Sequence, residues 1–196
     1  MTRMNVAVRA VYVGGVCATA FVAAFVSCTA VRQVRPLEPG ESAVNVSLGG
    51  PVTQYIGDAY APLPFLGIGY NRGLAPWLDV EAGIDITHLL YKNLSCDVGA
   101  NFRPVTAERW RPQLIVSPRG HIATDFSQYF RYHPVLNLTA AWNPGEGAFY
   151  PYIGLENWWE LWEKREDGTR QEHHWIPAPY VGLSYAATRW QYQIEM

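Results

Sequence analysis

The chain has 196 residues and a formal net charge of −2, which argues against the basic surface that nucleic-acid binding requires. Charged residues make up only 16% of the chain, whereas it contains 8 Trp and 12 Tyr. Soluble domains average about 25% charged residues, and a water-exposed surface normally carries more charge than this one can. We therefore expect one domain with an unusually apolar surface and no nucleic-acid partner.

Residues 1–27 have the features of an export signal. A basic start precedes Ala10 to Val26, an apolar stretch that is too short and too rich in small residues for a lasting membrane helix. Its end, Phe25-Val26-Ser27-Cys28, resembles the lipobox of bacterial lipoproteins. The resemblance implies that Cys28 is acylated, becomes the mature N-terminus and tethers the chain to a membrane. The alternative is ordinary cleavage after Ala30.

Residues 28–41 contain Pro36 and Pro39 without periodicity and are expected to be a linker. From residue 42 onward, apolar and polar residues alternate with period two, which indicates strands. The nine expected strands are Ser42–Gly50, Leu63–Asn71, Trp77–His88, Leu94–Arg103, Trp110–Ser117, Tyr132–Trp142, Ala148–Trp159, Trp175–Tyr185 and Trp190–Met196.

The connections between these strands differ in length. Pro51 to Pro62 and Glu160 to His174 are expected to be long loops, and Asn143 to Gly147 a tight turn. Arg119 to Arg131 is ambiguous: it is either a loop, or it contains extended structure at His121 to Phe126.

Alternation is strictest in the hairpin of residues 77–103. Leu78, Val80 and Ala82 alternate there with Asp79 and Glu81. Each of its two runs is long enough to cross the hydrocarbon core of a bilayer as a tilted strand. The hairpin therefore suggests a membrane β-barrel, whose apolar face would point outward to lipid.

Three features favour an apolar exterior. The polar face is rich in glycine, which suits a crowded lumen and weakens a solvated strand. Connections at one end are short and those at the other are long, as in outer-membrane barrels. Aromatic residues flank the short turns, as an interfacial girdle requires: Tyr70, Phe102, Trp110, Trp142, Phe149, Tyr185 and Trp190.

On these patterns, residues 42–196 resemble the small outer-membrane β-barrel proteins of diderm bacteria. The resemblance implies an all-β, antiparallel up-and-down transmembrane barrel of 8–10 strands in the outer membrane. It also implies outer-membrane lipid, the barrel-assembly machinery and the lipoprotein-sorting machinery as partners. Nine strands conflict with the even number that such barrels have. We expect a ten-stranded barrel that lacks its closing strand or, second, an eight-stranded one.

A polar cluster is the first candidate site. It contains Asp79, Glu81, Asp85, Asp97, Arg103 and Glu156. One interpretation is a proton or cation path or a carboxylate pair for acid–base chemistry. The other, which we favour, is a lumen plug of charges that pair with one another.

The remaining candidates are weaker. Glu172, His173 and His174 could bind zinc, but adjacent residues on an extended chain point in opposite directions, so a solvated loop is favoured. The scattered His88, His121 and His133 are expected at interfaces or in loops. A belt at the outer leaflet is expected for Trp158, Trp159, Trp162 and Trp175 rather than a ligand site. Cys96 is expected to fill apolar space.

The sequence contains no phosphate loop, CxxC pair, zinc motif or recognisable Ser/His/Asp arrangement. We therefore expect no cofactor or metal, and a non-enzymatic, porin-like outer-membrane barrel with a structural, adhesive or small-solute role. One alternative is a lipocalin-like lipoprotein that binds an apolar ligand in a soluble barrel. A third hypothesis is a membrane-embedded lipid-modifying enzyme that uses lumenal or rim carboxylates.

Overall fold

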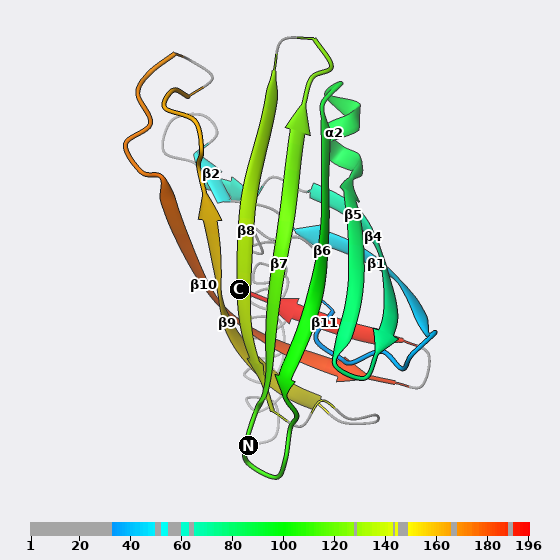
Figure 1. Cartoon of the computed structure of the whole chain (residues 1–196). Coiled ribbons are helices and arrows are strands. Elements are labelled where there is room, and N and C mark those ends of the chain that lie inside the picture. Colours follow the sequence, from blue (N-terminus) through cyan, green and yellow to red (C-terminus); the bar gives the residue numbers. More distant parts are fainter. Residues whose placement is uncertain are drawn as a thin grey trace, which may run out of the picture.

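A computed structural model describes residues 33–49, 52–54, 60–62, 65–127, 129–142, 144, 149–165, 168–187 and 190–196. Nine of its strands form one sheet in the order β1-β4-β5-β6-β7-β8-β9-β10-β11, so each main strand pairs with its neighbour along the chain. Every pairing is antiparallel. The sheet curls into a half-barrel (Figure 1). The expected all-β, up-and-down architecture with nine strands is confirmed.

The strands of the sheet are β1 (Ser42–Gly49), β4 (Phe65–Ala75), β5 (Leu78–Asp85), β6 (Leu94–Val105), β7 (Gln113–Thr124), β8 (Phe130–Ala141), β9 (Phe149–Trp159), β10 (Trp175–Ala186) and β11 (Gln191–Glu195). A one-turn helix, α2 (Ile86–Leu90), follows β5. Two short strands, β2 (Val52–Gln54) and β3 (Tyr60–Pro62), pair with each other. The segment expected to be a loop between Pro51 and Pro62 therefore contains a small hairpin.

Strand β7 is longer than its sequence pattern suggested. The segment Arg119 to Thr124 continues this strand, and only residues 125–129 connect it to β8. The interpretation of this region as a long loop is wrong, and the one with extended structure is right. Pro118 obscured the pattern because it has no N–H for the ladder. Pro118 lies on β7 between Arg119, which pairs with Gly99 of β6, and Val116, which pairs with Phe102 of β6.

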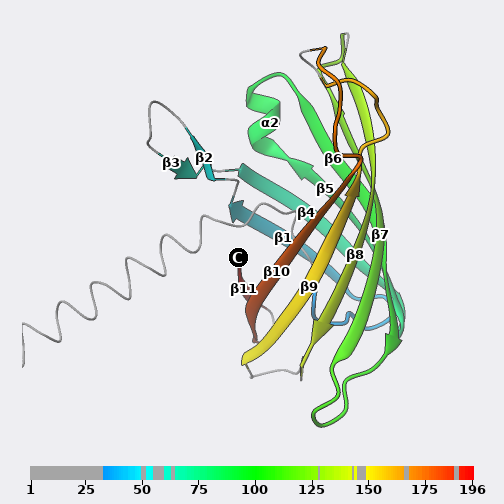
Figure 2. The ribbon, with the colours of Figure 1, turned by 90° about the vertical axis from the view of Figure 1, so that its left-hand side faces the viewer.

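Strand β5 is shorter than expected, because it ends at Asp85 rather than at His88. The backbone turns into α2 there, although the alternation of residue types continues. The Thr87 hydroxyl accepts a hydrogen bond from the Leu66 backbone N–H at 2.7 Å, and the His88 ring packs 4.9 Å from the Phe65 ring. These contacts with β4 hold α2 over the end of the sheet (Figure 2).

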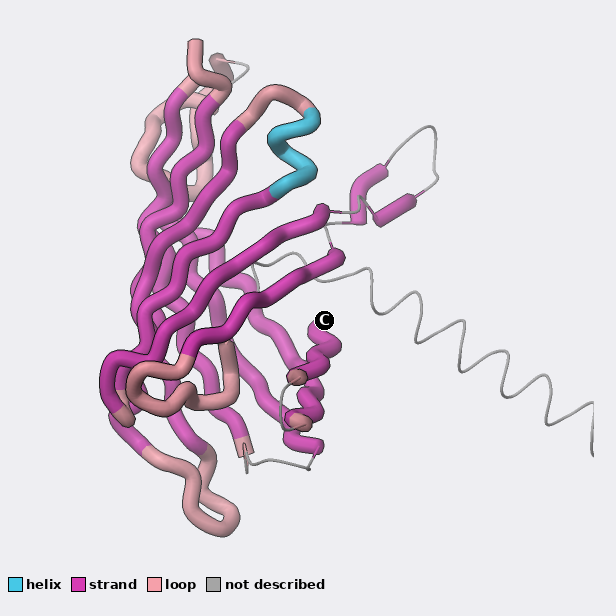
Figure 3. Tube along the Cα trace, turned by 90° about the vertical axis from the view of Figure 1, so that its right-hand side faces the viewer, coloured by secondary structure: helices cyan, strands magenta, loops and turns pink. Residues whose placement is uncertain are grey.

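The two faces of the sheet have opposite character. On the concave face, polar and charged side chains are buried, including Asp79, Glu81, Arg103 and Arg119. On the convex face, large apolar side chains are exposed: Val44, Val46, Leu48, Leu66, Ile68, Val80, Val98, Leu138, Ile153, Val181, Leu183 and Ile194. The curvature that separates the faces is visible along the strands in Figure 3. This is the reverse of the usual distribution in a water-soluble domain.

A strap of residues 33–41 crosses the end of the concave face opposite α2. It forms no strand, and Val34 and Leu37 in it are buried. Gly40 donates a backbone hydrogen bond to Gly73, 2.8 Å long, and the Gln113 side-chain amide donates one to the Val34 carbonyl, 3.4 Å long. The strap therefore links β4 to β7 across the concave face.

Apolar packing is concentrated near this strap. The largest buried cluster of the described residues consists of Val34, Ile115, Ala141, Tyr150, Tyr152, Tyr180 and Ala186. Tyr180 pairs across strands with Gly154, and its ring lies over that glycine. The Tyr180 hydroxyl donates to Asn137 Oδ1 at 2.7 Å. Tyrosine rings over cross-strand glycines thus fill the concave face between β8 and β10.

Gly154→Ala should lower the free energy of unfolding by about 1–3 kcal/mol, the usual cost of overpacking. A Cβ there would overlap the Tyr180 ring and lie 2.5 Å from the Leu138 carbonyl oxygen, which is backbone and cannot move freely. Urea unfolding followed by Trp fluorescence measures the change. Gly69→Ala is the matched control, because its Cβ would make ordinary contacts at 3.5 and 3.8 Å. Equal destabilisation of both variants would contradict this packing.

Candidate functional site

Two buried ion pairs occupy the middle of the concave face. Arg103 on β6 pairs with Asp79 on β5, and Arg119 on β7 pairs with Glu81 on β5. The sequence pattern had indicated Asp79, Glu81 and Arg103 but missed Arg119, which lay in the ambiguous segment. Arg119 is two residues after Ser117, so both side chains lie on the same face of β7. This spacing is the sequence signal that could have identified Arg119.

Hydrogen bonds connect the second pair to its neighbours. Asn101 Nδ2 donates to Glu81 Oε2 at 3.0 Å, and Ser117 Oγ donates to Asn101 Oδ1 at 2.6 Å. Gly99 stands between Glu81 and Arg119 in the register, and a Cβ on it would lie 2.6 Å from Arg119 Cγ. Glycine at this position therefore allows the arginine side chain to cross β6 and reach Glu81.

A cavity of about 250 Å³ lies on the concave face near α2. Asp85 and Asp97, the other two β5–β6 members of the predicted polar cluster, line it together with Ser95, His88 and His121. Glu156, the last member, is buried on β9 and accepts a hydrogen bond from Trp158 Nε1 at 2.6 Å. The predicted cluster is therefore divided between the ion-pair layer, the cavity wall and β9.

Ser95 lies between an imidazole and a carboxylate in this cavity. Its Oγ is 3.0 Å from His121 Nε2 and donates a hydrogen bond to Asp85 Oδ2. The same Oδ2 is 3.5 Å from His88 Nδ1. The strand register explains why these side chains lie close together. Ile84, next to Asp85, pairs with Cys96, next to Ser95. Asp97 pairs with His121, so the ends of β5, β6 and β7 near α2 lie side by side.

A second imidazole and an indole pack behind His121. The ring centroids of His121 and Trp158 are 5.1 Å apart, and those of His121 and His133 are 5.8 Å apart. His133 Nδ1 is 3.2 Å from Glu160 Oε1. The expectation that the histidines are scattered over interfaces and loops is wrong for His121 and His133. Trp158 faces the interior and is not part of an outer belt.

These errors have a common cause. His121 and His133 pair directly across β7 and β8, but the sequence pattern did not define where β7 ends. Without that end, the register was unknown and neither histidine could be placed near Ser95. The sequence search for a Ser/His/Asp arrangement failed for the same reason, since the three residues are separated by 10 and 26 positions.

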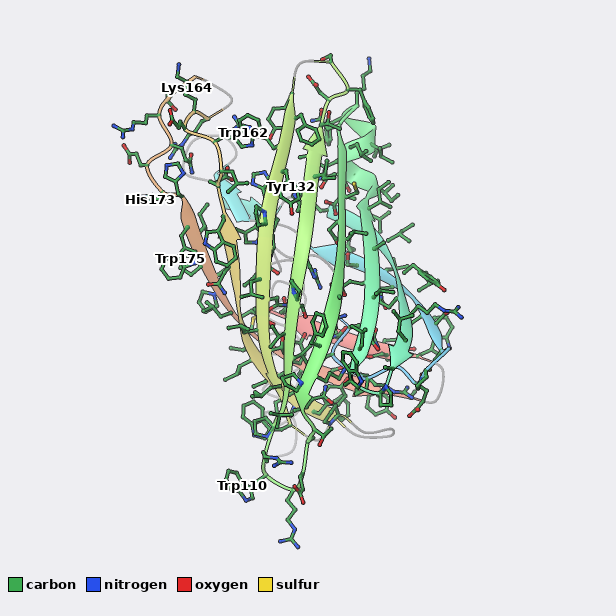
Figure 4. The ribbon with its side chains drawn as sticks, viewed as in Figure 1. Trp110, Tyr132, Trp162, Lys164, His173 and Trp175 are labelled. Atoms are coloured by element: carbon green, nitrogen blue, oxygen red, sulfur yellow. The ribbon has the colours of Figure 1, made fainter. Side chains whose placement is uncertain are left out.

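Most of the aromatic residues that were expected to form a girdle lie at the strand ends opposite α2. Trp110 lies in the β6–β7 turn and is 83% exposed, as Figure 4 shows at the lower tip. Phe149 stacks on Tyr185 at 4.7 Å, and Trp77 on Phe102 at 6.2 Å. Trp142 directly follows β8, and Trp190, 70% exposed, directly precedes β11.

Tyr70 departs from this arrangement. It is in the middle of β4, opposite Val44 and Ala82. Strand β4 continues to Ala75 because Arg72 and Leu74 extend the alternation and the strap bonds to Gly73. The sequence pattern predicted that this strand ends near Tyr70, but β4 ends five residues later, at Ala75.

The other candidate positions give no assembled site. Among the described residues, no group of three or more His, Cys, Asp or Glu side chains is placed to hold a metal ion. His173 and His174 lie in the exposed loop between β9 and β10, where Figure 4 shows His173 near Lys164 and Trp162. Cys96 is half-buried on β6. Cys28 and the expected signal segment lie outside the described residues.

In the part of the chain that the structure describes, no helix is long and apolar enough to cross a membrane. No protein-family model, no curated protein and no solved structure matches the chain.

Removing one partner of the Glu81–Arg119 pair should be costly. Arg119→Met leaves Glu81 as a buried charge without its ion-pair partner, and we expect a loss of about 3–5 kcal/mol in the free energy of unfolding. The double variant Glu81→Gln with Arg119→Met should regain part of this loss, because neither charge remains. The measurement is urea unfolding of the single and double variants.

The exposed pair of Glu108 and Arg111, 3.0 Å apart, is the matched control. Arg111→Met should change stability by less than about 1 kcal/mol, because surface pairs contribute little. If Arg119→Met and Arg111→Met had similar effects, the ion pair on the concave face would not be a structural element.

Proposed function

We propose that this chain forms the wall of an outer-membrane β-barrel whose interior is occupied and does not conduct solutes freely. Its convex face meets lipid, and its primary role is structural, adhesive or ligand-binding. The observation that carries the proposal is the inverted sheet: charged side chains are buried on the concave face while twelve aliphatic side chains are exposed on the other.

The exposed apolar face supports lipid as its surroundings. Exposed aliphatic side chains occur on each long strand, most densely on β1, β4 and β10, and such an apolar surface would drive aggregation in water. In a bilayer the same surface has no such cost. The seven inner strands, β4 to β10, pair on both sides as the hydrocarbon region demands, whereas β1 and β11 are the edges of the sheet and pair on one side only. A lipocalin-like soluble barrel would need the reverse arrangement, with the charges of Asp79 and Arg103 outside.

The occupied interior argues against an open channel. Buried ion pairs, the tyrosine layer and the strap follow one another along the concave face, from its middle to the end opposite α2. The strap lies across that end, with Val34 and Leu37 buried. Solutes would have to displace this packed layer, so we expect binding at the α2 end rather than passage.

The strap also supports lipidation as a second anchor. Gln33, its first described residue, bonds to Gln191 of β11 at 3.3 Å, at the end of the sheet opposite α2. Cys28 is five residues earlier in the sequence, a span of at most about 18 Å of extended chain. An acyl chain on Cys28 would therefore enter the leaflet at the girdle end, which we propose is the periplasmic side.

Cysteine labelling in outer-membrane vesicles tests the proposal. After Cys96→Ala, single cysteines are introduced at Val98→Cys, 63% exposed on the convex face of β6, and at Leu90→Cys, 79% exposed in α2. A charged, membrane-impermeant maleimide should react with Leu90→Cys and more than an order of magnitude more slowly with Val98→Cys, because lipid covers the latter.

Both cysteines should react equally once the vesicles are dissolved in denaturant, which controls for the reagent. Equal rates in intact vesicles would mean that the convex face is wet. In that case the chain would not be a membrane barrel.

A further inference from the structure

We infer that the cavity at the α2 end is a serine-hydrolase site, in which Ser95 attacks small carboxylic esters and His121 is the general base. This goes beyond the proposed barrel role and departs from the expectation of a non-enzymatic protein. It does not depend on whether the convex face meets lipid, since the cavity is formed by the concave face alone.

The geometry of the nucleophile carries the inference. Ser95 Oγ and His121 Nε2 are 3.0 Å apart, the hydrogen-bond distance that a general base needs from the proton it removes. A serine hydroxyl is a weak nucleophile until an adjacent base takes its proton. Because Ser95 is itself buried while His121 and Asp85 line a cavity with it, the reacting oxygen is shielded from bulk water but borders an open space.

The roles of the neighbours follow from their contacts. Asp85 Oδ2 accepts the single proton of the Ser95 hydroxyl in this structure, so the hydroxyl has to rotate toward His121 Nε2 before the imidazole removes that proton. His88 lies beside the same carboxylate oxygen, 3.5 Å away. The arrangement differs from a conventional triad, in which the carboxylate bonds to the histidine, because here both groups meet at the serine.

The step balances without a cofactor. Ser95 Oγ bonds to the ester carbonyl carbon while its proton moves to His121 Nε2. The carbon–oxygen bond to the alcohol then breaks, and the alcohol leaves with that proton. Water then attacks the acyl carbon and gives a proton to His121. The bond from that carbon to Ser95 Oγ breaks, His121 returns the proton to Ser95 Oγ, and the carboxylic acid leaves, which regenerates both side chains.

The cavity restricts the substrate. Its volume of about 250 Å³ is below the range of about 300–1,000 Å³ for sites that hold drug-sized ligands. Phe65 and Trp158 supply apolar walls beside the carboxylates Asp85 and Asp97. A short acyl group fits such a space, and a negatively charged acyl group would be repelled by the two carboxylates. The substrate class is therefore an ester of a short, uncharged acyl group.

The first experiment treats the full, folded chain with a fluorophosphonate probe and maps the adduct by mass spectrometry. Ser95 Oγ should bond to phosphorus with loss of fluoride, while the other serines stay unmodified. Ser127→Ala is the matched control: Ser127 Oγ also donates to a carboxylate, Asp125 Oδ2, at 2.8 Å, but it lies in the β7–β8 connection and does not line the cavity. It should keep full labelling, whereas Ser95→Ala should lose it.

The second experiment measures hydrolysis of p-nitrophenyl acetate, butyrate and palmitate. We expect turnover of the two short esters, loss of it in Ser95→Ala, and a fall in kcat/KM of about 10²–10⁴-fold in His121→Gln, the usual contribution of a general base. Asp85→Asn should lower kcat with little change in KM, because Asp85 contacts the hydroxyl and not the acyl group.

Wild-type chain that neither forms the Ser95 adduct nor hydrolyses the short esters would overturn the inference, even if the variants fail to fold. An adduct on Ser127 as readily as on Ser95 would also overturn it. Neither result would affect the barrel proposal, which the maleimide experiment tests separately.

Discussion

The pairing of charges on the concave face is the constraint on which the rest of the structure depends. An unpaired Glu81 or Arg119 in that position would cost several kcal/mol, whereas the pair is compatible with burial. Pairing requires Arg119 to cross β6, which requires Gly99, and it requires β5, β6 and β7 to keep one register. A shift by one residue would move every charge to the apolar face.

The concave face changes character along its length. Tyrosine rings, small residues and the strap fill the end opposite α2, and the ion pairs of Asp79 and Glu81 occupy the middle. Next to α2, the packing gives way to a cavity with polar walls. The densely packed end stabilises the sheet, whereas the cavity leaves space beside Ser95 and His121 for the proposed ligand.

This division accounts for how the proposed barrel wall and the proposed hydrolase site could coexist in one sheet. The convex face is mostly apolar, so the proposed contact with lipid makes no demand on the concave face. Ser95, His121 and Asp85 are held by neighbouring strands, and rigid strands position reacting groups more precisely than loops do. The short helix α2 then places His88 over the same end of the sheet.

The sequence by itself determined the nine strands and the face on which most of their side chains lie, because period-two alternation is a local property of the chain; Trp158 and the end of β7 are the exceptions. Asp79, Glu81 and Arg103 could be placed inside on that basis alone. Only the tertiary structure decided which polar groups meet. Partners depend on cross-strand register and on where strands end, and these are set by non-local pairing, as at the end of β7 and the turn into α2. For that reason the pairing of Arg119 with Glu81 and the contact of Ser95 with His121 could not be read from the sequence.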